Sequence, residues 1–156
     1  MVRFRIDQPV RAPPEFVVRW WLDYSSEDVR LTDGLVDRTV TPLDPDRTRL
    51  STTAEFGGRV RTTTGTVTRT GPRTWHMSGH VISSGVTVST LQTGYTVLPD
   101  GRGSRVIADF EFVGRTWSWR LALAVSGYAL RRRQRASFQD YAAAIERAFR
   151  VGPPAT

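Results

Sequence analysis

The chain has 156 residues and a formal net charge of +7, with no cysteine. This length is typical of one domain with its own hydrophobic core. The lack of cysteine excludes disulfides and thiolate chemistry, and 39% hydrophobic with 24% charged residues indicates a globular rather than a disordered chain.

The first 34 residues are expected to form a strand followed by two helices. VRFRID (residues 2–7) alternates apolar and charged residues, which predicts a half-buried strand rather than a signal peptide, so we expect a cytoplasmic protein. APPEFVVRWWLDY then predicts a helix, because proline suits a first turn and the apolar residues recur at helical spacing. A short second helix is expected at residues 25–34, with Ser25 or Ser26 as N-cap and Gly34 at its end.

Residues 35–114 are expected to form an antiparallel meander of six strands. Turn signals occur at DPD (44–46), GG (57–58), GP (71–72), SSG (83–85) and PDG (99–101), and the segments between them are rich in threonine, valine and aromatic residues. SRVIADFEFV is the clearest strand, with Val106, Ala108, Phe110 and Phe112 on one face. Another element must pack on that apolar face to bury it.

The segment from residue 116 to 149 predicts the helix that covers it. Its expected inward stripe consists of Trp117, Leu121, Ala124, Tyr128, Phe138, Ala142, Ile145 and Phe149. The apolar run LALAVSGYAL within it has ten residues, too few to span a bilayer. We expect residues 1–150 to form one domain and residues 151–156 a flexible tail.

This order of elements resembles the helix-grip fold of the START-like superfamily, which includes Bet v 1-like plant allergens, polyketide aromatase/cyclases and lipid-transfer domains. The likeness covers roughly residues 2–149 and includes APPEFVVRWWLDY after the first strand, the PDGRGSRV turn before the last strand, and the closing helix. It implies an α+β fold in which a curved antiparallel sheet of about seven strands wraps the C-terminal helix. It also implies a cavity for a lipid, isoprenoid, polyketide or aromatic ligand between them.

Ten residues are predicted to line that cavity. The aromatic candidates are Trp20, Phe56, Trp75, Tyr95, Phe110, Phe112, Trp117 and Tyr128, because pockets are mainly apolar and aromatic. Arg131 and Arg135 fall inside the helical stripe and are candidate anchors for a carboxylate, phosphate or polarised carbonyl. The alternative is that these arginines extend to the cavity mouth or pair with an acid on the sheet.

Two strand segments leave their orientation open. In RVRTTTGTVTRTG the threonines at 62, 64, 66 and 68 share one face, which is either a polar inner wall or an exposed face, and Gly65 can mark a bulge. In WHMSGH we expect Trp75 and Met77 inside and His76 and His80 outside. On a strand, four residues separate the histidines by about 13 Å, too far for one metal ion. With no phosphate-binding loop or dinucleotide fingerprint, neither cofactor nor metal is expected.

Three functions remain open at this stage. The first is binding of a hydrophobic small molecule, and the second is an aromatase/cyclase-like enzyme with His80 and Tyr95 as catalytic candidates. The third is transient docking on an anionic membrane, because residues 115–150 carry eight arginines against Asp140 and Glu146. Nucleic acid is not favoured, since no exposed aromatic platform for bases is predicted. The sequence does not set the oligomeric state.

Overall fold

The computed structural model describes residues 1–24, 35–56 and 59–151, without the side chains of Phe56 and Arg59. The helix expected at residues 25–34 therefore lies outside the described residues, as do residues 152–156. Val151 belongs to the last helix.

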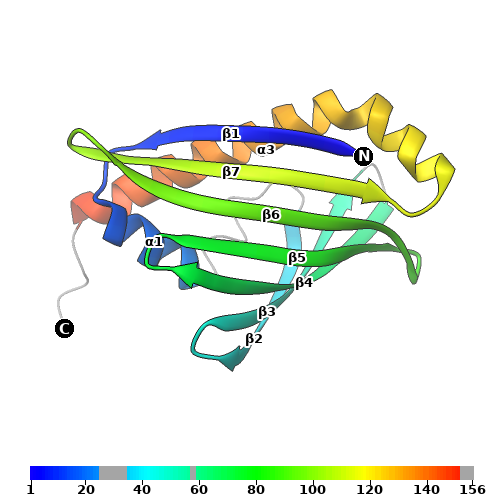
Figure 1. Ribbon diagram of the computed structural model, residues 1–156, viewed down its shortest axis with the longest axis horizontal. Coiled ribbons are helices and arrows are strands. Elements are labelled where there is room, and N and C mark those ends of the chain that lie inside the picture. The colour runs from blue at the N-terminus through cyan, green and yellow to red at the C-terminus, as the bar shows by residue number, and fades with distance from the viewer. Residues whose placement is uncertain (25–34, 57–58, 152–156) are drawn as a thin grey trace.

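Seven antiparallel strands form one curved sheet, as the sequence predicts (Figure 1). The strands are β1 (Val2–Val10), β2 (Leu35–Asp44), β3 (Arg47–Phe56), β4 (Arg59–Gly71), β5 (Thr74–Ser83), β6 (Val86–Asp100) and β7 (Gly103–Gly114). Their order is β1-β7-β6-β5-β4-β3-β2, so the first strand pairs with the last and all other neighbours are consecutive hairpins.

Two helices are described. Helix α1 (Pro14–Leu22) has proline at its start and Glu15 in its first turn, where the helix dipole favours an acid, and it buries Val17 and Trp20. Helix α3 (Trp117–Val151) is 35 residues long and packs mainly against β1 and β7. In the part of the chain that the structure describes, neither helix is both long and apolar enough to cross a bilayer.

The core lies between the inner face of the sheet and α3. Ile6 of β1 and Val106 of β7 are 2% and 0% exposed, and they belong to one cluster with Phe138 and Ile145 of α3. On the outer face, charged side chains form cross-strand pairs, such as Arg105 Nη2 with Asp7 Oδ2 at 2.7 Å. Because these pairs are exposed, they contribute little to stability, and burial on the inner face dominates.

The register through β4 answers the question left open by its threonines. Gly65 lies directly opposite Gly79, and the pairing of β4 with both neighbours is regular there, so no bulge changes the phase. A Cβ on Gly65 would lie 2.8 Å from the carbonyl oxygen of Ser78, and one on Gly79 would lie 2.6 Å from that of Thr64. Glycine at both positions allows this close approach. The threonines at 62, 64, 66 and 68 therefore face outward, opposite to Thr63 and Val67.

Candidate functional site

A cavity of about 240 Å³ lies between the sheet, α1 and the C-terminal half of α3. Six of the seven strands and both described helices contribute to its wall. The lining residues are Trp20, Trp21, Tyr24, Arg38, Leu50, Thr52, Thr63, Val67, Trp75, Met77, Leu91, Thr93, Tyr95, Phe110, Gln134, Phe138 and Tyr141. Its volume is about that of eight liquid water molecules, just below the usual range for ligand pockets.

Aromatic rings dominate the wall and contact one another. Trp75 stacks on Tyr95 with ring centroids 5.1 Å apart, and Trp21 lies 5.2 Å from Phe138 and 5.3 Å from Tyr141. These contacts join α1, two sheet strands and α3, so each ring is held by rings on other elements. The result is a preformed surface against which a flat apolar molecule can stack.

A few polar groups interrupt this apolar wall. Arg38 of β2 is the one charged side chain among the described lining residues, and it is half-buried. Thr52, Thr63 and Gln134 add hydroxyl and amide groups, and Thr93 is only 3% exposed. The site therefore combines an aromatic surface with one cation, a combination suited to a ligand with an apolar body and a polar or anionic end.

Tyr95 brings a hydroxyl into the cavity. Burial, together with the nearby Tyr141 and Tyr24, raises the pKa of this phenol well above its ordinary value, although Arg38 acts in the opposite direction. The group therefore stays protonated near neutral pH. It is suited to donate a hydrogen bond to a carbonyl or carboxylate oxygen.

The aromatic prediction is confirmed for the placement of some side chains and wrong for others. Trp20, Trp75, Tyr95 and Phe110 line the cavity. Phe112 is buried in the adjacent core and is not among the lining residues. The Phe56 side chain lies outside the described residues. Trp117 and Tyr128, by contrast, are 77% and 79% exposed, so their expected inward orientation is wrong.

The expected placement of Arg131 and Arg135 is also wrong. Both side chains are exposed and, with Tyr128, line a groove on the surface of α3. The inner side of α3 is marked instead by Leu123, Phe138 and Ile145, all less than 10% exposed. A stripe centred on the exposed Trp117 and Tyr128 lies well to one side of that direction, which is the physical reason for the error. The arginine that reaches the cavity comes from β2.

The histidines lie where the sequence predicts. His76 and His80 are exposed on the outer face of β5, whereas Trp75 and Met77 line the cavity. His80 is therefore removed as a catalytic candidate within this cavity. Among the described residues, no group of three or more acidic or histidine side chains is placed to hold a metal ion.

Four lining residues that sequence reasoning did not propose carry much of the site: Trp21, Arg38, Phe138 and Tyr141. Phe138 and Tyr141 lie one helical turn apart, and Phe138 was placed on the inner stripe without a ligand role, so helical spacing contained their signal. Arg38 had none. It stands in a strand whose other residues are mostly exposed, and it shares the inner face of the sheet with its cross-strand partner Thr52.

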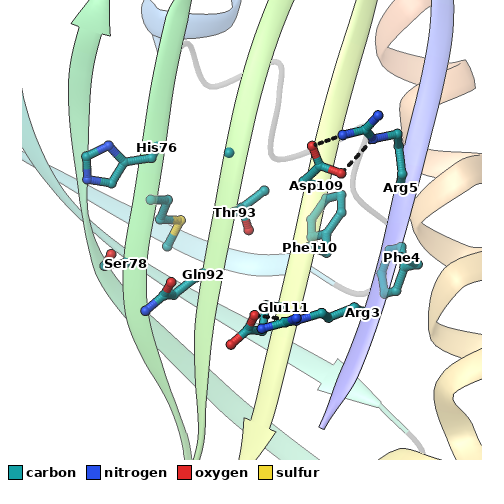
Figure 2. Close-up of a pocket in the computed structure, with 12 residues that line it drawn as sticks. Arg3, Phe4, Arg5, His76, Ser78, Gln92, Thr93, Asp109, Phe110 and Glu111 are labelled. Atoms are coloured by element: carbon teal, nitrogen blue, oxygen red, sulfur yellow. Dashed lines mark hydrogen bonds and ion pairs between the residues drawn. The ribbon is translucent and has the colours of Figure 1, made fainter.

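A second hollow, of about 760 Å³, lies on the outer face of the sheet over Gly94, whose lack of a side chain leaves space between its neighbours. Figure 2 shows its rim, where Arg5 donates two hydrogen bonds to Asp109 and Arg3 pairs with Glu111. These charges already satisfy one another, and the hollow is open to solvent. The smaller inner cavity is therefore the better candidate site.

Seven antiparallel strands gripping a C-terminal helix define the helix-grip fold, and this protein has that fold. An aromatase/cyclase from Streptomyces sp. R1128, Zhui, superposes with a TM-score of 0.76 at 13% identity, covering 96% of this chain and 95% of its own. The TTHA0849 protein of Thermus thermophilus gives 0.74 at 15% identity, covering 92% and 96%. Ara h 8.0201 gives 0.69 at 10% identity, covering 94% and 98%.

No family model matches the sequence, and no curated protein matches it. At identities this low, likeness to solved structures shows the fold alone, because one fold carries many functions. The function must therefore be argued from the cavity.

Proposed function

We propose that the protein binds a compact hydrophobic or amphipathic small molecule, of lipid, isoprenoid, polyketide or aromatic type, between its sheet and helix α3. The observation that supports this most directly is the aromatic cavity with Arg38 in its wall. A chain that needed only stability would fill this space with side chains, because an empty cavity weakens packing.

The lining indicates which ligands fit best. Trp21, Trp75 and Tyr95 offer ring faces to a planar group, and Arg38 offers a charged donor to a carboxylate, sulfonate or polarised carbonyl. The volume of about 240 Å³ suits a body of one or two rings. We therefore expect an aromatic acid or ketone to bind more tightly than a fatty acid.

An aromatase/cyclase-like enzyme is the second candidate. Its support is Tyr95, whose protonated hydroxyl shares the cavity with Arg38, so that both can hydrogen-bond an enolising carbonyl. Among the described lining residues there is no carboxylate and no imidazole to remove a proton. Binding without turnover is therefore the primary proposal. If the protein turns over a short polyketone and Tyr95→Phe abolishes that activity, the enzyme proposal replaces it.

A pair of matched probes tests the binding proposal. We expect 2-naphthoate and its neutral analogue 2-acetylnaphthalene to bind and to quench the fluorescence of Trp21 and Trp75. Arg38→Met should weaken the naphthoate by about tenfold and the ketone much less, because a charge-assisted hydrogen bond is lost. Arg135→Gln is the control, since that side chain is exposed outside the cavity, and it should leave both affinities unchanged.

Native mass spectrometry of gently purified protein gives an independent reading, because a molecule carried from the cell adds its mass to the chain. The proposal is overturned if neither probe binds and the protein carries nothing. Equal loss of naphthoate affinity in Arg38→Met and Arg135→Gln would contradict the assigned role of Arg38.

A further inference from the structure

The N-terminal half of α3 exposes a row of large apolar side chains. Trp117, Leu121, Val125 and Tyr128 are 77%, 56%, 79% and 79% exposed, and we call these four residues the outer stripe. At 100° per residue they fall within about 80° of one another, so they form one continuous face. Scattered exposed apolar residues are ordinary, but a contiguous row of this kind marks an interaction surface.

The same face becomes basic one turn further along the helix. Arg131, Arg132 and Arg135 follow the outer stripe and line a groove with Tyr128. From residue 115 to residue 139 the sequence has six arginines and no acid. The surface from Trp117 to Arg135 is about 27 Å long, apolar in its first part and positively charged in its second.

We propose that this surface docks on an anionic lipid bilayer. The outer stripe would enter the boundary between head groups and acyl chains, with Trp117 and Tyr128 as amphipathic anchors. Arg131, Arg132 and Arg135 would bind the lipid phosphates, their aliphatic stems lying on the apolar surface. Charge complementarity argues for this occupant, since apolar insertion and cationic contact are both present on one helical face.

Other occupants fit the surface less well. In an antiparallel, symmetric pair of two copies packed on this stripe, the arginines of one copy would lie alongside Trp117 and Leu121 of the other. In a parallel pair, the two arginine groups would lie together. A nucleic acid would contact the arginines but would leave Leu121 and Val125 in water. Of these three occupants, a bilayer is the one that offers both an apolar interior and negative charge along this face.

The proposal does not depend on the cavity ligand. The outer stripe belongs to the N-terminal half of α3, whereas Gln134, Phe138 and Tyr141 in the other half line the cavity. Variants on the outer stripe should therefore leave binding of 2-naphthoate intact, which separates failure of this proposal from failure of the binding proposal.

Flotation with vesicles tests it. We expect binding to phosphatidylcholine vesicles containing 30% phosphatidylglycerol and little binding to phosphatidylcholine alone. Val125→Asn should weaken binding by about tenfold, and Arg132→Gln by about fivefold. Binding should also fall when salt is raised from about 0.05 to 0.5 M, because the screening length shortens.

Two exposed residues elsewhere provide matched controls. Leu98→Asn in β6 and Arg102→Gln in the β6–β7 turn remove the same kinds of side chain at the opposite end of β7 from the start of α3, and both variants should bind vesicles as the unmodified protein does. Circular dichroism melting confirms that each variant is folded. Equal binding to neutral and anionic vesicles, or loss shared by the controls, overturns the proposal. The proposal is also overturned if the protein is a dimer that Val125→Asn dissociates. It is likewise overturned if the vesicles do not bind and an oligonucleotide binds with the same dependence on Val125 and Arg132.

Discussion

The two halves of α3 contain similar kinds of apolar residue but differ in what covers them. In the C-terminal half, Phe138 and Ile145 are 2% and 0% exposed, whereas Val125 and Tyr128 in the N-terminal half are each 79% exposed. In Figure 1 the N-terminal half, drawn in yellow, extends past the start of β1 while the other half runs along the sheet. The N-terminal half still buries Leu123, which is 8% exposed, so its apolar residues are divided between the core and solvent. Helical periodicity alone does not distinguish these environments.

The largest effect expected from this comparison is on stability. Ile145→Ala should lower the free energy of unfolding by about 3 kcal/mol, because it removes buried methyl groups and leaves a cavity. Val125→Ala, the matched change in the exposed half, should alter it by less than about 0.5 kcal/mol. Urea unfolding of both variants measures the difference. Similar losses in both would mean that the N-terminal half is also covered.

A smaller effect concerns the pH dependence of the buried half, where Tyr95 stacks on Phe138 at 6.4 Å. Because burial raises the pKa of Tyr95 in the folded state, the unfolded chain loses this proton first as pH rises above about 10. Stability should therefore be intact below that pH and fall above it, by at most about 1.4 kcal/mol per pH unit from this group. Urea unfolding from pH 8 to 11 should show a shallower decline in Tyr95→Phe. An identical slope in both proteins would contradict the assignment.

The smallest effect is expected for the exposed tyrosine. Tyr128→Ala should change the free energy of unfolding by less than about 0.5 kcal/mol, since its side chain is 79% exposed. Thermal melting at neutral pH checks this value. A loss above about 1 kcal/mol would show that Tyr128 packs against part of the protein in solution, and that would weaken the case for a free docking surface.

Much of the fold was predictable because its signals are local. Alternation along β1 and β7, turn residues between the strands and a long amphipathic segment predict a meander closed by a helix, and the structure confirms it. The inward orientation of Trp75 and the outward orientation of the histidines followed from strand alternation. Most errors fall on α3, where Trp117 and Tyr128 suggested an inner stripe that lies to one side of the face buried by Leu123, Phe138 and Ile145.

The sequence by itself determined the elements, their order and which faces of the strands are apolar, because these depend on residues close together in the chain. Tertiary structure alone decided which part of α3 is covered and which arginine reaches the cavity. Arg38 lies on the cavity face because it pairs with Thr52 of β3, which in turn pairs with Thr63 of β4, and all three side chains line the cavity. Exposure of Arg135 follows from which side of α3 packs on the sheet, and entry of Arg38 into the cavity follows from how β2 pairs with β3, neither of which a local pattern records.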